Sequence, residues 1–148
     1  MEEARGNGTM MSRDETRDVP RSHAAKALAK CLEFLDTAGA SLQSKRWNAA
    51  GLNAIHAGIA AADAALIAAT GTRSIARDHN VVIALLEAQP MTHFSASQRR
   101  QLVGLLKLKN QVAYDQRLLT EIEARQLVDH AARLAKWATL IVEDGTPA

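Results

Sequence analysis

The chain has 148 residues, of which 47% are hydrophobic and only 3% aromatic, and its formal net charge is +2. This length fits one domain with a core built from Ala and Leu, and no disulfide is needed to stabilise it. The single cysteine excludes an intramolecular disulfide and a multi-cysteine zinc motif, and it indicates a reducing compartment, so we expect a cytoplasmic protein. The small net charge does not by itself indicate nucleic-acid binding.

Both ends of the chain lack the apolar periodicity of a helix. Residues 1–20 mix charged residues with Gly and Ser, so we expect a disordered N-terminal tail, and they contain no apolar stretch typical of a signal peptide. Met10 and Met11 leave the start codon open. Residues 144–148 should form a short C-terminal tail, which leaves a single helical domain over residues 21–143.

Two helices are predicted in the first half of this domain. The first should begin after Ser22, a favoured N-cap residue, and end at Gly39, with Cys31 on its apolar side. The second should cover residues 47–70, of which about half are Ala, and should end at Gly71 in the left-handed conformation. A membrane-spanning helix needs roughly 20 apolar residues. Four polar residues argue against that interpretation, and we expect no membrane contact: Asn48, Asn53, His56 and Asp63.

Two of these polar residues, His56 and Asp63, are predicted to be buried on one stripe of the second helix. They are seven residues apart in the sequence, so they lie roughly 10 Å apart along the helix axis and cannot touch. A buried carboxylate must find a partner or shift its pKa. Two interpretations stay open: a structural pair that sets the register of the helix, or a polar pocket wall or dimer contact.

Capping signals predict three further helices. The signals are Asp78 before a helix over residues 79–88 that Pro90 closes, Ser95 with Gln98 before a helix through at least Gln111, and Thr120 with Glu123 before a last amphipathic helix. Five helices without strand-like alternation predict an all-α, antiparallel up-and-down bundle. The alanine-rich second helix suits the centre of this bundle or the seam of a homodimer.

The fourth predicted helix is basic. It and the residues after it carry Arg99, Arg100, Lys107, Lys109 and Arg117, with Asp115 as the single acid. This pattern is typical either of a solvated face or of a surface for a phosphate-bearing ligand. Lys109 lies on the apolar stripe, so its ammonium either reaches the surface or pairs with Asp63 or Asp115. We predict one polar cluster of Asp63, Lys109 and Tyr114.

Three segments carry a resemblance to a known family: AIHAGIAAADA, GTRSIARDH, and LKNQVAYD followed by a long amphipathic helix. Together they resemble the HEPN domain, over residues 22–141. The resemblance implies a helical bundle that forms homodimers and needs no cofactor or metal. It implies either a metal-independent ribonuclease, often a toxin, or a non-catalytic partner of a nucleotidyltransferase or antitoxin that binds nucleotides or RNA.

The ribonuclease members of that family carry an Arg and, four to six residues later, a His near the fourth helix. Lys109 and Tyr114 take these places here. A His with a pKa near 6.5 exchanges protons at neutral pH, whereas a Tyr with a pKa near 10 does not without help. The resemblance therefore implies a non-catalytic, nucleotide-binding or RNA-binding interaction module.

Candidate ligand-binding residues follow from the second and third segments. They are Arg73, Ser74, Asp78, His79, Lys109 and Tyr114. Arg73 and His79 straddle a turn, so the alternative is a ribonuclease that uses these two residues as its catalytic pair. Structural roles at the ends of the two helices stay open for both. Arg125 and His130 match the same bare pattern but point about 140° apart on one helix. No phosphate-binding loop, nucleophile elbow or metal-binding motif is present in the sequence.

Overall fold

The structure is a computed structural model that describes residues 15–144. Its elements are β1 (Thr16–Asp18), α1 (His23–Gln43), α2 (Trp47–Thr70), β2 (Thr72–Ser74), α3 (Asn80–Glu87), a 3₁₀ turn (Pro90–Thr92), α4 (Ala96–Tyr114) and α5 (Glu121–Asp144). Five helices and one short two-stranded sheet confirm the predicted all-α bundle.

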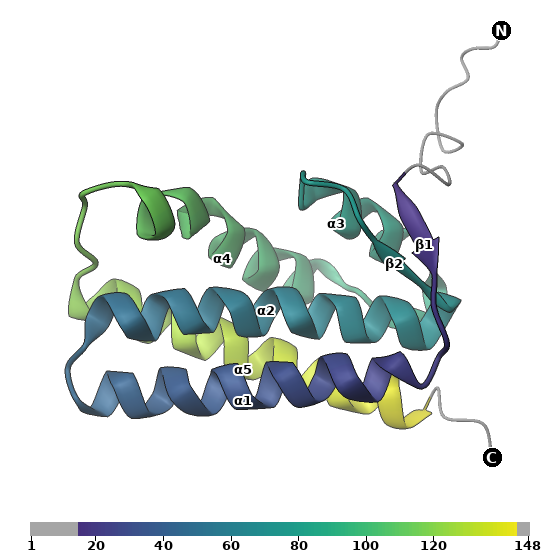
Figure 1. The fold of residues 1–148 in the computed structure, drawn as a ribbon, viewed down its shortest axis with the longest axis horizontal. Coiled ribbons are helices and arrows are strands. Elements are labelled where there is room, and N and C mark those ends of the chain that lie inside the picture. Colours follow the sequence, from purple (N-terminus) through teal and green to yellow (C-terminus); the bar gives the residue numbers. More distant parts are fainter. Residues whose placement is uncertain (1–14, 145–148) are drawn as a thin grey trace, which may run out of the picture.

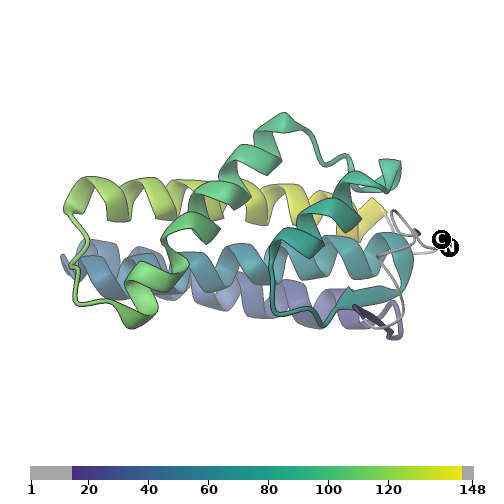
Figure 2. The same ribbon diagram turned by 90° about the horizontal axis from the view of Figure 1, so that it is seen from above.

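The long helices run up and down along one axis. Helices α1, α2 and α5 lie side by side, and α4 crosses α2 and α5 obliquely on one face, with the short α3 on the same face (Figures 1 and 2). The two strands lie at the end of the bundle where α1 begins and α2 ends (Figure 1). The other end contains the turn between α1 and α2 and the connection between α4 and α5.

Helix α2 is the centre of the hydrophobic core. Its alanines are almost all buried, and its bounds match the prediction, with Gly71 in the left-handed conformation at its end. By length and composition alone α2 could also cross a membrane, and it is the one helix among residues 15–144 for which this holds. However, 67% of its most apolar window is buried by the other helices. This burial is what we expect of a core helix.

Two glycines of α2 allow leucine side chains to approach the helix backbone closely. A Cβ atom on Gly58 would lie 2.4 Å from Cδ1 of Leu105 in α4, and one on Gly51 would lie 2.2 Å from Cδ1 of Leu119. Both distances are shorter than atomic contact allows, so only glycine permits this approach without a shift of the leucine. The two glycines are seven residues apart and therefore share a face of α2.

Three predictions about element ends are wrong. The expected N-terminal tail includes strand β1, which pairs antiparallel with β2 in the register Arg17 to Arg73; residues 1–14 lie outside the described part. Helix α1 begins after Ser22 as predicted, although the Ser22 side chain forms no cap hydrogen bond, but it continues past Gly39 to Gln43. A glycine inside a helix costs only about 1 kcal/mol, so the packing of α1 against α2 overrides it. At the other end, α5 extends through Asp144, and the remaining residues are not described.

The close contact at Gly58 and the open space around Gly39 give a matched pair of substitutions. We expect Gly58→Ala to lower the free energy of unfolding by about 1–3 kcal/mol, because the new methyl group overpacks against buried Leu105. Gly39→Ala should raise it by up to about 1 kcal/mol, because nothing lies within 4 Å of the added Cβ and Ala favours the helix. Urea denaturation measures both values. Stabilisation by both changes would contradict the close contact between α2 and α4.

Candidate functional site

A polar pocket of about 290 Å³ lies between the start of α3 and the second half of α4. It is lined by Arg77, Asp78, His79, Asn80, Leu106, Lys109 and Asn110. Leu106 is the single apolar residue in this set, so the lining consists mainly of hydrogen-bonding and charged groups.

The short segment between β2 and α3 forms one side of the pocket. Gly71 turns the backbone away from α2 with φ at 72°, and pairing with β1 then holds β2 in place. Asp78 starts α3, since its Oδ1 atom accepts a hydrogen bond from the backbone N–H of Asn80 at 2.9 Å. His79 is therefore held beside the first turn of α3, half-buried and opposite α4.

Three influences shift the pKa of His79. Burial lowers the pKa of His79 from its ordinary value, the positive charge of Lys109 lowers it further, and the carboxylate of Asp78 partly offsets the shift. His79 is accordingly neutral at neutral pH. Lys109 is partly buried and its side chain lines the pocket. It forms no ion pair with a described residue, which supports the interpretation in which its ammonium reaches the surface.

Asp63 belongs to a second group of charges. Burial raises the pKa of its carboxyl group to about 6, even though Arg73 of β2 and Lys30 of α1 both lower it. The sequence left open whether Asp63 finds a partner or shifts its pKa; in the structure its pKa is raised, and the cations that act on it are not the expected Lys109. Arg73 acts on Asp63, whereas the cation that acts on His79 is Lys109. His79 and Lys109 thus line one pocket, while Arg73 lies outside it and acts on Asp63.

The structure corrects two further predictions. His56 is exposed, and its ring packs against that of Phe34 with centroids 5.5 Å apart, because α2 faces outward beside α1 at this turn; Asp63, two turns later, is partly buried. Tyr114 is the last residue of α4 and its side chain is 77% exposed. Since Asp63 interacts with Arg73 and Lys30 instead, the predicted cluster of Asp63, Lys109 and Tyr114 is wrong.

The remaining candidates are only partly gathered by the fold. Ser74 lies in β2, where its Oγ atom accepts a hydrogen bond from the N–H of Ala76 at 3.4 Å, and it does not line the pocket. Three lining residues were missed by the sequence analysis: Arg77, Asn80 and Asn110. Each is a polar residue next to, or one residue away from, a predicted site residue, and that proximity was the available signal.

Other reactive groups are accounted for within the described part of the chain. Arg125 forms an exposed ion pair with Glu121, while a Cβ on Gly104 would lie 3.0 Å from Nε2 of His130, so Arg125 and His130 diverge as expected. Burial raises the pKa of the Cys31 thiol to about 11, so it stays protonated and unreactive. Residues 15–144 hold no cluster of three or more potential metal ligands.

Comparison with known proteins adds no family assignment. No protein-family model and no curated protein matches this sequence. The candidate site therefore rests on its own geometry, and the HEPN resemblance stays a prediction.

The perturbed carboxyl group of Asp63 predicts a specific pH dependence of stability. From about pH 4 to about pH 6 the folded state binds a proton that the unfolded state has released, so this group's contribution to stability falls as the pH rises. The full effect is on the order of 3 kcal/mol. Asp63→Asn should remove it and exceed the wild type in stability at pH 7. Urea denaturation of both proteins across this range measures the difference, and a difference that does not change with pH would contradict the assignment.

Proposed function

We propose that the protein is a non-catalytic HEPN-like module that binds a phosphate-bearing ligand, a nucleotide or an RNA phosphate, between α3 and α4. In this proposal it acts with a nucleotidyltransferase or toxin–antitoxin partner. The observation that supports it is the pocket in which Arg77, His79 and Lys109 are gathered from two elements.

The charge balance of the pocket favours an anion. Arg77 and Lys109 contribute two positive charges, Asp78 contributes one negative charge, and His79 is neutral near pH 7. Guanidinium and ammonium groups donate charge-assisted hydrogen bonds, which are about twice as strong as neutral ones.

The carboxamides in the lining suit the rest of a nucleotide. The side chains of Asn80 and Asn110 each offer donors and an acceptor, which a sugar hydroxyl or the edge of a base can use. The pocket volume of about 290 Å³ is at the small end of ligand sites. A phosphate with an attached ribose fits this size better than a large cofactor does.

The lack of a second proton-exchanging group favours a non-catalytic role. His79 is the one imidazole in the described lining, and imidazole is the side chain that ordinarily exchanges protons near neutral pH. Tyr114, which takes the family's His place, does not line the pocket. RNA cleavage without a metal needs both a base and an acid, and the pocket supplies one such group.

The homodimer implied by the resemblance stays part of this proposal. The alanines of α2 are used within the chain to pack against the other helices. A dimer seam would therefore have to use another face of the bundle.

Binding by the pocket can be tested with two lysines of the same helix. We expect wild-type protein to bind adenosine monophosphate or a fluorescent RNA oligonucleotide, and Lys109→Ala to weaken that binding about tenfold or more, since a charge-assisted hydrogen bond is lost. Lys107→Ala should change it little, because Lys107 is exposed and does not line the pocket. Isothermal titration and fluorescence anisotropy measure these affinities. Failure of the wild type to bind either probe, or equal losses in the two variants, would refute the proposal.

The alternative, a ribonuclease that uses Arg73 and His79, predicts a different result. Purified protein would then cleave RNA in the presence of a chelator, and both Arg73→Ala and His79→Ala would abolish cleavage. We expect no cleavage by the wild type, because Arg73 acts on Asp63 and does not line the pocket that holds His79. Gel analysis of labelled RNA decides between the two functions.

A further inference from the structure

Three of the most exposed large apolar side chains gather at one end of the bundle. Tyr114, Leu118 and Ile122 are 77%, 74% and 70% exposed, and they lie four residues apart from the end of α4 to the start of α5. Exposed apolar side chains that cluster are typical of interaction sites, whereas scattered ones need no explanation.

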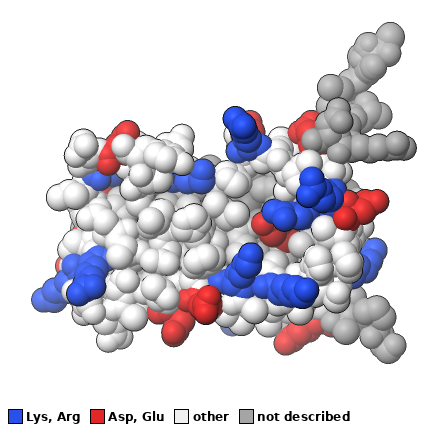
Figure 3. Space-filling model, viewed as in Figure 1, with Lys and Arg blue, Asp and Glu red and all other residues white. Residues whose placement is uncertain are grey.

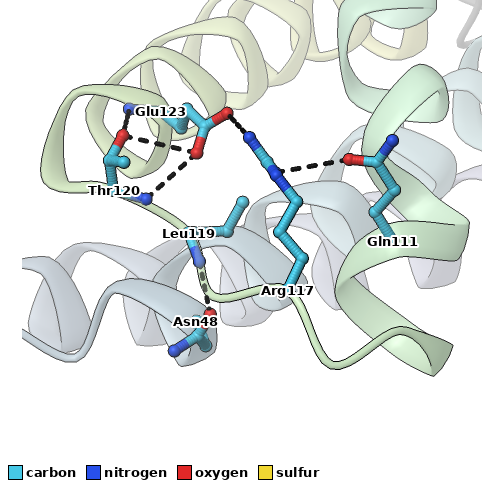
Figure 4. Close-up of polar contacts among 6 residues, drawn as sticks. All are labelled: Asn48, Gln111, Arg117, Leu119, Thr120 and Glu123. Carbon is cyan, nitrogen blue, oxygen red and sulfur yellow. Dashed lines mark hydrogen bonds and ion pairs between the residues drawn. The ribbon is translucent and has the colours of Figure 1, made fainter.

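The connection that presents these side chains is anchored in the core. Leu119 is buried and packs against Gly51 of α2, and its backbone N–H donates a hydrogen bond to Oδ1 of Asn48 at 2.8 Å (Figure 4). Leu118 and Leu119 are neighbours, yet one is exposed and the other buried. The contacts of Leu119 with α2 therefore hold the neighbouring Leu118 in its exposed position.

Side-chain contacts with α4 and α5 also stabilise the connection. Arg117 donates to Oε1 of Gln111 at 3.3 Å and forms an ion pair with Glu123 (Figure 4). Glu123 also accepts a hydrogen bond from the N–H of Thr120 at 3.0 Å, while its own N–H donates to Oγ1 of Thr120 at 3.1 Å. A braced loop loses little conformational entropy when a partner binds, so its exposed side chains are preorganised for contact.

Unpaired positive charge lies at the same end of the bundle as these apolar side chains (Figure 1). Lys45 and Arg46 form the turn between α1 and α2, two residues before the Asn48 that holds Leu119. Lysine and arginine atoms project at this end of the molecule (Figure 3). Both residues are exposed, and neither forms an ion pair within residues 15–144.

The nearby acids are mostly neutralised. Glu121 and Glu123 are paired with Arg125 and Arg117.

We define the end surface as Lys45, Arg46, Tyr114, Leu118 and Ile122. Its unpaired cations favour a partner that carries negative charge.

From this arrangement we propose that the end surface binds an acidic segment of a partner protein. Apolar residues of that segment contact Tyr114, Leu118 and Ile122, and its carboxylates meet Lys45 and Arg46. A second copy of the chain would bring the same cations to the interface. An anionic membrane is typically bound by a cluster of about four or more Lys or Arg residues, whereas the end surface contributes two, Lys45 and Arg46. No residue of the end surface lines the α3–α4 pocket, so this proposal does not depend on the proposed ligand.

Selection on the full-length protein from a phage library of random dodecapeptides tests the proposal. We expect the selected peptides to combine Asp or Glu with Leu, Phe or Trp. The affinity of a synthesised peptide should fall about tenfold or more in the double variant Leu118→Ser with Ile122→Ser, and likewise in Arg46→Glu. Leu140→Ser is the matched control, because Leu140 is 55% exposed and lies near the other end of α5. Its peptide affinity should be unchanged, and thermal unfolding should show that all variants fold.

Several results would overturn the proposal. These are the absence of enriched peptides, enrichment of basic ones, or peptide binding that the end-surface variants do not weaken. Sedimentation of the wild type with phosphatidylglycerol vesicles, lost in the double variant, would assign the end surface to a membrane. A dimer in sedimentation velocity that is lost in the double variant would assign it to a second copy. Nucleotide binding by the double variant reports on the pocket separately, so failure of one proposal is distinguishable from failure of the other.

Discussion

The close approach of neighbouring elements to α2 is the constraint on which the rest of the structure depends. Alanine and glycine keep the surface of α2 thin, so Leu105 of α4 and Leu119 of the α4–α5 connection pack directly against Gly58 and Gly51. Burial of one leucine side chain contributes about 2 kcal/mol. Because both glycines lie on one face of α2, these two contacts together set the path of α4 and the place where it turns into α5. The ligand pocket and the end surface both depend on that path.

A second set of contacts holds the beginning of α4. Thr92 is fully buried, and its single hydroxyl hydrogen is shared between the carbonyl oxygens of Leu86 and Gln89, which lie 2.8 and 2.7 Å from Oγ1. The indole N–H of Trp137 donates to the carbonyl oxygen of Thr92 at 2.7 Å, which ties the connection between α3 and α4 to α5. With both ends of α4 attached, the start of α3 faces α4 across a pocket whose width is set by the core.

The same geometry determines how charges are distributed. Where α4 crosses the bundle, Lys109 lies beside His79, and Asp63 is left with Arg73 and Lys30. Burial is the largest influence on both titratable groups, and it acts in opposite directions on their pKa values. It raises the pKa of the Asp63 carboxyl and lowers the pKa of the His79 imidazole, because in each case it disfavours the charged form. The pocket thus combines a neutral ring with cations, a suitable set of donors for an anion.

The sequence by itself determined the features that depend on contacts between residues close together in the chain. The five helices, the glycine stop at Gly71, and the capping boxes at Ser95 and Thr120 all follow from such local hydrogen bonds, and they were predictable. The sequence also indicated that Asp63 must find a partner or shift its pKa if it is buried, but it left open which of the two occurs.

Only the tertiary structure decided which face of each helix meets which neighbour. An alanine-rich helix has little difference between its faces, so its sequence could not tell that His56 points outward. Strand β1 forms only because β2 lies beside it, more than fifty residues along the chain. Lys109 lines one pocket with His79 because of the path of α4 across α2, where Leu105 packs against Gly58 in a contact between distant segments. Such contacts depend on how side chains fit together in three dimensions, and no local pattern in the sequence records that fit.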